Sequence, residues 1–153
     1  MRFRISLVAG ALLLISAAIA NGQTRPDLNG TWKMNPAKSH FSGNGPTSIS
    51  IKFIQKASSL TETLNLSGEA GDRSFDLKYT TDGKEGDNQI GPQQVKTTAT
   101  WQKDALVIEW KADGNSFRRR ITLSGDGKVM TIAVHHADQN GEASDDTVVL
   151  EKQ

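Results

Sequence analysis

The chain has 153 residues, 18 Lys+Arg against 17 Asp+Glu for a formal net charge of +1, and no cysteine. A chain of this length is near the common size of one domain and can bury a core of its own. The missing cysteines exclude disulfides and thiolate metal sites, and the balanced, interspersed charges argue against nucleic acid as a partner.

The first twenty residues are predicted to be a cleaved secretory signal peptide. Arg2 and Arg4 precede an apolar run from Ile5 to about Ala20, and the run ends in the small residues of a cleavage site. This run is shorter than the roughly 20 apolar residues that span a bilayer. We therefore expect a single domain over 21–153 that is exported, either periplasmic or secreted, with no integral membrane segment after cleavage.

From residue 30 onward, apolar and polar residues alternate with a period of two, which is typical of half-buried β-strands. Gly-, Asp- and Asn-bearing stretches break this pattern at hairpin spacing. The predicted strands are 30–35, 47–55, 59–67, 73–81, 94–102, 105–112, 116–124, 128–136 and 145–151. The expected fold is all-β, an antiparallel up-and-down meander of about 8–9 strands that closes into a barrel, with a β-sandwich as the alternative.

Two charged residues fall on faces that are predicted to point inward. Glu62 is in phase with Leu60, and Arg119 is in phase with Phe117. Because an unpaired buried charge is costly, each needs a partner. In the functional interpretation Arg119 holds an acidic head group of a ligand, with Glu62 or Tyr79 as its partner at rest. The alternatives are a β-bulge that turns either residue outward, or a structural ion pair without a ligand.

No specific catalytic or metal-binding constellation is found in the sequence. His40 lies in an early loop, and the adjacent His135 and His136 would point to opposite faces of a strand, so they could not easily bind one metal ion. His136 shares a face with Ile132. It is expected either to have its ring nitrogens hydrogen-bonded within the fold or to lie at the end of the strand. We therefore expect no enzymatic activity, no metal and no cofactor.

The stretch "LNGTWKMN" at 28–35 resembles the first-strand Gly-x-Trp signature of the calycin group, which includes the lipocalins and fatty-acid-binding proteins. The chain looks like the small exported lipocalin-like proteins of bacteria. The resemblance implies that Trp32 packs across one end of a barrel and that Gly30 belongs to the same floor motif.

The late segment 99–136 resembles the late hairpins of a fatty-acid-binding barrel, and "VVLEKQ" resembles its closing strand. The closing strand has Val148 and Leu150 where fatty-acid binders carry an Arg and a Tyr for the carboxylate. The segment "NPAKSHFSGNGP" at 35–46 is too short and too rich in Gly and Pro for their two-helix lid. These differences favour a lipocalin-like protein over a fatty-acid binder.

The leading hypothesis is an exported module that binds a small hydrophobic or amphipathic molecule in a barrel cavity. Its anchor would be Arg119 and Glu62, and apolar walls with a few polar groups are the usual form of such sites. The predicted walls are Phe53, Leu64, Leu77, Tyr79, Trp101, Trp110 and Ile121. The alternative is an envelope or protein-interaction module whose filled interior leaves only a small cavity and whose surface carries an exposed apolar patch.

Overall fold

The alternating residues form ten antiparallel strands in a computed structural model of the chain, which describes residues 25–153. The strands are β1 (Gly30–Met34), β2 (Ser48–Lys56), β3 (Ser59–Ser67), β4 (Arg73–Thr80), β5 (Gly86–Ile90), β6 (Gln93–Gln102), β7 (Ala105–Ala112), β8 (Asn115–Leu123), β9 (Val129–Ala137) and β10 (Ala143–Lys152). All belong to one sheet with the order β4-β3-β2-β1-β10-β9-β8-β7-β6-β5. The predicted all-β meander is confirmed, whereas the predicted signal peptide at 1–20 lies outside the described residues. Between residues 25 and 153 there is no helix long and apolar enough to cross a membrane.

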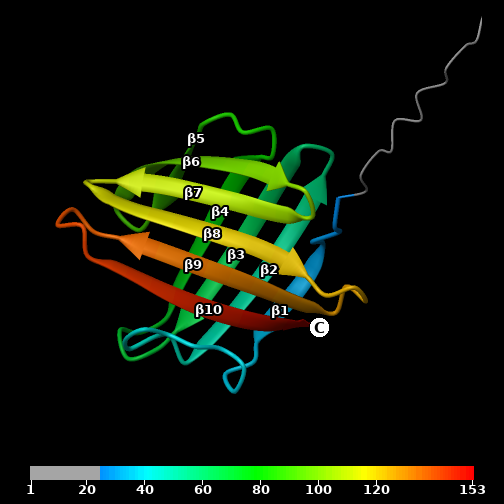
Figure 1. The fold of residues 1–153 in the computed structure, drawn as a ribbon, viewed down its shortest axis with the longest axis horizontal. Helices are drawn as coiled ribbons and strands as arrows, with labels where there is room; N and C mark the ends of the chain where they lie inside the picture. The colour runs from blue at the N-terminus through cyan, green and yellow to red at the C-terminus, as the bar shows by residue number, and fades with distance from the viewer. Residues whose placement is uncertain (1–24) are drawn as a thin grey trace, which may run out of the picture.

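The sheet curls into a nearly closed barrel. In Figure 1, β1–β4 form the rear wall and β6–β10 form the front wall. The two ends of the strand order, β4 and β5, lie side by side. The predicted barrel is therefore observed, and the sandwich of two separate sheets is not.

A side-chain amide bridges the seam between β4 and β5. The backbone N–H of Lys78 donates to Asn88 Oδ1 at 2.8 Å, and Asn88 Nδ2 donates to the carbonyl oxygen of Lys78 at 2.8 Å. Asn88 Nδ2 also donates to Thr97 Oγ1 on β6 at 2.8 Å. The Asn88 side chain thus makes the pair of bonds that a facing backbone would make in a regular ladder.

Strand β5 is the element that the sequence prediction lacked. No strand was predicted between 73–81 and 94–102, but the chain from Gly86 to Ile90 pairs with β6. Its sequence, GDNQI, shows no apolar alternation, because the inward position at its centre is Asn88 rather than an apolar residue. The pattern of period two is absent where a polar side chain replaces the usual core contact.

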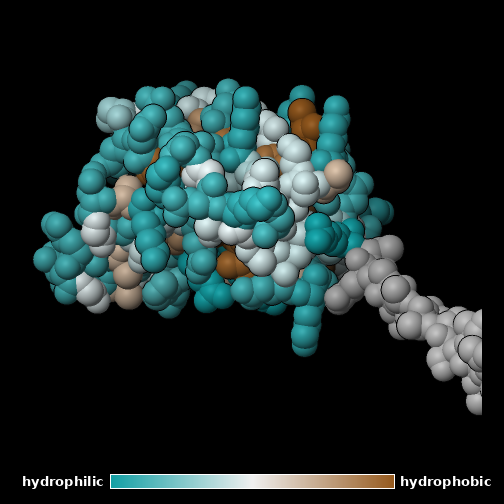
Figure 2. Space-filling model, turned by 90° about the horizontal axis from the view of Figure 1, so that it is seen from above, coloured by the Kyte–Doolittle hydropathy of each residue, from teal (hydrophilic) through white to brown (hydrophobic). Residues whose placement is uncertain are grey.

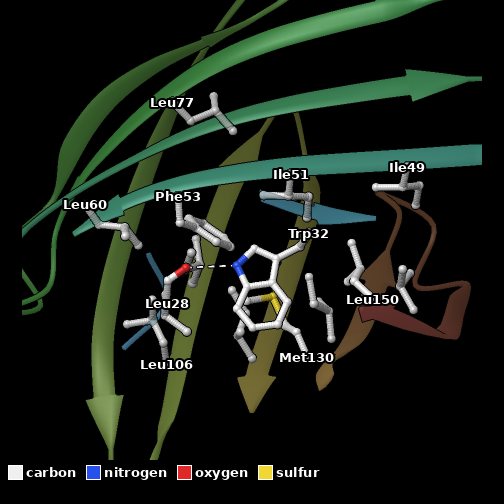
Figure 3. Packing of buried hydrophobic residues seen from close by; sticks show 14 of the residues in the cluster. Leu28, Trp32, Ile49, Ile51, Phe53, Leu60, Leu77, Leu106, Met130 and Leu150 are labelled. Carbon is white, nitrogen blue, oxygen red and sulfur yellow. Dashed lines mark hydrogen bonds between the residues drawn. The ribbon is translucent and has the colours of Figure 1, made fainter. Parts of the chain in front are cut away.

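The barrel end at which β1 begins and β10 ends, called the closed end here, is filled around Trp32. The Trp32 indole is 0% exposed, and its Nε1 donates to the carbonyl oxygen of Leu28 at 2.9 Å. Figure 3 shows Met130 and Leu106 close to this indole. Buried aliphatic side chains from several strands complete the packing, so this end contains side chains rather than a cavity.

Gly30 lies beside Trp32 under the side chain of Lys152. The ammonium Nζ of Lys152 is 5.3 Å from the centroid of the Trp32 ring, within cation–π range. Gly30 has a φ of 122°, and a Cβ at this position would lie 3.0 Å from Cε of Lys152. A larger residue would strain the backbone and push the lysine away from the indole, which explains the need for glycine two residues before the tryptophan.

The segment that joins β1 to β2 runs along β10 and contains no helix. Asn35 N–H donates to the carbonyl oxygen of Val149 at 2.8 Å, and His40 exchanges backbone hydrogen bonds with Thr147 at 2.7 and 2.8 Å. The ring of Phe41 packs on Gly45, where a Cβ would lie only 2.2 Å from it. The prediction that this segment forms no two-helix lid is confirmed.

We expect Asn88→Ala to loosen the seam between β4 and β5. The substitution removes two hydrogen bonds to the Lys78 backbone, so the free energy of unfolding should fall by about 1–3 kcal/mol. Hydrogen exchange of the Lys78 amide, followed by mass spectrometry or NMR, should accelerate. The exposed neighbour Gln89 offers the control: Gln89→Ala should change neither quantity. Unchanged exchange at Lys78 in Asn88→Ala would contradict the role of the amide bridge.

Candidate functional site

A buried ion pair joins the two walls of the barrel. Arg119 on β8 donates from Nη1 to Glu62 Oε1 at 2.8 Å and from Nη2 to Glu62 Oε2 at 2.6 Å. Tyr79 on β4 donates its hydroxyl hydrogen to Glu62 Oε2 at 3.0 Å and accepts a bond from Arg119 Nη2 at 3.2 Å. Glu62 is 0% exposed and Arg119 is 6% exposed. The two charges face inward as predicted, and strand pairing continues unbroken through both residues, so neither sits in a bulge.

The surroundings of Glu62, Tyr79 and Arg119, called the charged triad here, favour a protonated phenol and a charged guanidinium. Burial, together with the negative charge of Glu62, raises the pKa of Tyr79 well above its ordinary value of 10.0. Burial acts to lower the pKa of Arg119, but attraction to Glu62 outweighs it and holds the pKa above the ordinary value. A two-pronged bond between guanidinium and carboxylate is among the strongest side-chain interactions. Removing one partner of such a buried pair generally costs about 3–5 kcal/mol, since the other charge is left unpaired.

Three aromatic side chains form a row next to the charged triad. Trp110 on β7, Phe117 on β8 and His136 on β9 are direct partners in the strand register. The rings of Trp110 and Phe117 meet edge to face with centroids 5.5 Å apart, and those of Phe117 and His136 stack at 4.3 Å. The guanidinium carbon of Arg119 lies 5.0 Å from the Trp110 ring centroid. Trp110 therefore contacts both the charged triad and the aromatic row.

The aromatic row forms one wall of a hollow at the opposite end of the barrel from Trp32. This hollow, called the mouth pocket here, has a volume of about 330 Å³. It is lined by Ile90, Gln93, Val95, Trp110, Ala112, Asn115, Phe117 and His136. Four other hollows, of about 200 to 420 Å³, lie at turns or on the outer face. Small-molecule sites usually have volumes of about 300–1,000 Å³, so the mouth pocket is at the small end of that range.

The predicted ligand-contacting residues fall into two groups. Glu62, Tyr79, Arg119 and Trp110 come together as described above. Phe53, which pairs with Gly30, and Trp101, which pairs with Leu106, lie toward the closed end. Of the nine predicted wall and anchor residues, Trp110 alone lines the mouth pocket. Ligand contact by the other eight, Leu64, Leu77 and Ile121 included, stays a prediction.

Sequence reasoning missed most of the pocket wall. Ile90 and Gln93 were missed because the hairpin of β5 and β6 was not predicted. Phe117 was placed on an inward face, and His136 was placed on the face of Ile132 and expected to be hydrogen-bonded within the fold or to lie at the end of the strand. The contact between the two depends on the register between β8 and β9, which no local pattern encodes.

The two adjacent histidines point to opposite faces, as predicted. His136 stacks on Phe117 in the interior, whereas His135 contacts Asp145 Oδ1 at 2.7 Å on the outside. Across residues 25–153, no group of three or more His, Cys, Asp or Glu side chains is placed to hold a metal ion.

No protein-family model and no curated protein sequence matches the chain. Solved structures with a similar fold include a secretory abundant heat soluble protein from Ramazzottius varieornatus, at 13% identity and a TM-score of 0.62 over 86% of this chain and 98% of that one. The zebrafish ileal bile acid-binding protein matches at 15% identity and a TM-score of 0.59, over 82% and 98%. A Schistosoma mansoni fatty-acid-binding protein matches at 14% identity and a TM-score of 0.56, over 82% and 95%. At these identities the comparison shows the fold alone: the chain forms the same kind of β-barrel as these proteins.

We expect the phenol of Tyr79 to stay protonated in the folded protein above pH 10. Tyr79 is the chain's single tyrosine, so tyrosinate absorbance reports this group alone. The unfolded chain would release the proton near the ordinary pKa of 10.0, whereas the folded chain holds it. The protonated phenol of Tyr79 therefore contributes fully to the stability of the folded state below about pH 10, and this contribution is lost as the pH rises further. Tyrosinate should appear together with the loss of native circular dichroism.

The variant Tyr79→Phe serves as the control, because it should lose this part of the alkaline pH dependence. Tyrosinate that formed near pH 10 while the circular dichroism spectrum stayed native would show that the phenol is not buried as described.

Proposed function

We propose that this protein binds a small, mostly apolar molecule in the mouth pocket of its barrel. The observation that carries the proposal is the inward-facing aromatic row of Trp110, Phe117 and His136 beside a hollow of about 330 Å³. Rigid rings and a few amide groups around a concave space are typical of small-molecule sites. Gln93 and Asn115 supply these amides at the rim.

The similar structures support the same class of function. The zebrafish protein is a bile acid-binding protein in complex with cholic acid, and the Schistosoma protein is a fatty-acid-binding protein in complex with arachidonic acid. A barrel of this shape can therefore hold apolar and amphipathic molecules. We propose a binding role rather than catalysis, so a bound molecule should be recovered with its mass unchanged.

The distribution of apolar surface favours ligand binding over a filled interaction module. Among the described residues, Ile54 is the only large hydrophobic side chain classed as exposed, at 43%. On the face shown in Figure 2, hydrophilic residues predominate and hydrophobic atoms appear only in small separate spots. A module that bound a protein through apolar contacts would be expected to show a continuous patch. The closed end is filled, but the mouth pocket remains.

The charged triad supports the pocket wall in this proposal. Arg119 lies against Trp110, and Trp110 lines the mouth pocket. Contact of both Nη atoms of Arg119 with an acidic head group, the ligand group predicted from the sequence for this residue, would require the ion pair to rearrange. The geometry therefore favours an indirect role in holding the Trp110 ring.

We also propose that the mature protein acts outside the cytoplasm, on the strength of Arg2, Arg4 and the apolar run to Ala20. Protein recovered from the extracytoplasmic fraction is expected to have an intact mass that lacks residues 1–20. A full-length mass in that fraction, or full-length protein confined to the cytoplasm, would contradict this proposal.

Filling the mouth pocket should weaken ligand binding. We expect Ala112→Phe to weaken binding of the neutral fluorophore N-phenyl-1-naphthylamine by at least about tenfold, since loss of about 1.4 kcal/mol suffices for that change. The added ring would occupy space that Ala112 leaves in the pocket wall. Fluorescence titration gives the affinity, and thermal unfolding confirms that the variant folds.

The matched control is Ala133→Phe, on the exposed outer face of β9, which should bind as the unchanged protein does. Unchanged affinity in Ala112→Phe would place the ligand elsewhere. No binding by the unchanged protein would favour the filled-core interpretation.

A further inference from the structure

The polarity of the mouth pocket bears on the chemical class of the ligand. Its eight lining residues include no Asp, Glu, Lys or Arg. The polar side-chain groups that they offer are the amides of Gln93 and Asn115, the imidazole of His136 and the indole N–H of Trp110. Amides can donate and accept hydrogen bonds without carrying a charge, so they suit an alcohol, ester or amide group.

The inward-facing cation that lies closest to the aromatic row is already engaged. Both Nη atoms of Arg119 donate to the Glu62 carboxylate, at 2.8 and 2.6 Å, and the face of the guanidinium lies against Trp110. The positive charge is thus balanced by a negative charge at hydrogen-bonding distance. Nε of Arg119 is buried without a hydrogen-bond partner among the described residues. A carboxylate that took the bonds of both Nη atoms would have to displace Glu62, which would then be left buried without its partner.

The rim adds negative charge beside the pocket. Asp113, in the turn between β7 and β8, accepts a hydrogen bond on Oδ2 from Gln93 Nε2 at 2.9 Å, and Gln93 lines the pocket. Within residues 25–153, Asp113 makes no ion pair. An anion that approached this side of the mouth would therefore meet repulsion.

From these three observations we infer that the mouth pocket selects an uncharged ligand, an apolar molecule with a neutral hydrogen-bonding group, and discriminates against carboxylates. This inference rests on the proposed function and defines its ligand class. The physical reason is that a carboxylate entering the pocket loses its hydration and meets no Lys or Arg side chain in the pocket lining, whereas a hydroxyl group loses much less hydration free energy.

The test compares two ligands with the same alkyl chain, decan-1-ol and decanoate, at a pH where the acid is ionised. Each displaces N-phenyl-1-naphthylamine from the unchanged protein in a fluorescence titration. We expect decan-1-ol to bind at least about tenfold more tightly than decanoate, equivalent to about 1.4 kcal/mol. Equal affinities, including no displacement by either ligand, or a preference for decanoate, would overturn the inference.

Two variants at position 115 separate the effect of side-chain charge on affinity from the effect of side-chain size. Asn115→Lys places a cation at the half-buried pocket wall, and Asn115→Met adds a side chain of similar length without charge. The affinity of Asn115→Lys for decanoate should exceed that of Asn115→Met at least about fivefold, roughly 1 kcal/mol, while their affinities for decan-1-ol should agree. If the two variants bound decanoate equally, the absence of a counter-charge would not be what excludes anions, and the inference would be wrong.

Binding of the fluorophore distinguishes failure of this inference from failure of the proposed function. If the unchanged protein binds N-phenyl-1-naphthylamine and yet does not favour decan-1-ol, the ligand class is wrong and the binding function stands. If it binds neither the fluorophore nor either alkyl ligand, both proposals fail.

Discussion

The ion pair between Glu62 and Arg119 constrains the rest of the barrel interior. Its members come from β3 and β8, which lie in opposite walls, and both are buried, with exposed fractions of 0% for Glu62 and 6% for Arg119. A shift of register in either strand would turn a charge to the wrong face and leave the other unpaired. Apolar contacts alone would tolerate several relative placements of the two walls. The ion pair favours one of them.

The barrel interior is packed differently on the two sides of this ion pair. Toward the closed end, Trp32 and its aliphatic neighbours pack without a cavity, and the polar atom of the indole is satisfied by Leu28. Toward the mouth, side chains are only partly buried, and the aromatic row leaves space beside it. Under the proposed function, stability and ligand recognition are thus separated along the barrel axis, so a residue at the mouth can be changed without disturbing the packing around Trp32.

Most strands could be predicted from the sequence because their alternation is local. Trp32 and Gly30 were also recognisable, since their spacing and position resemble a known first strand. β5 could not be predicted, because its inward side chain, Asn88, contacts backbone groups of β4 rather than the apolar core. The inward direction of Glu62 and Arg119 could be predicted, because each lies on the same strand face as inward-pointing apolar residues. Their mutual contact could not, because it depends on how closely the two walls approach each other. That distance is a property of the whole barrel rather than of any segment.

The Asn88 bridge also has a consequence for how this protein meets other copies of itself. A meander that ends in β4 and β5 has two strand edges, and an unpaired edge is a template on which another chain can add a strand. By holding Lys78 of β4, the amide keeps the two edges against each other at this point of the seam. Asn88, whose polarity removes the apolar alternation from β5, thereby protects the barrel against edge-to-edge aggregation at the seam between β4 and β5.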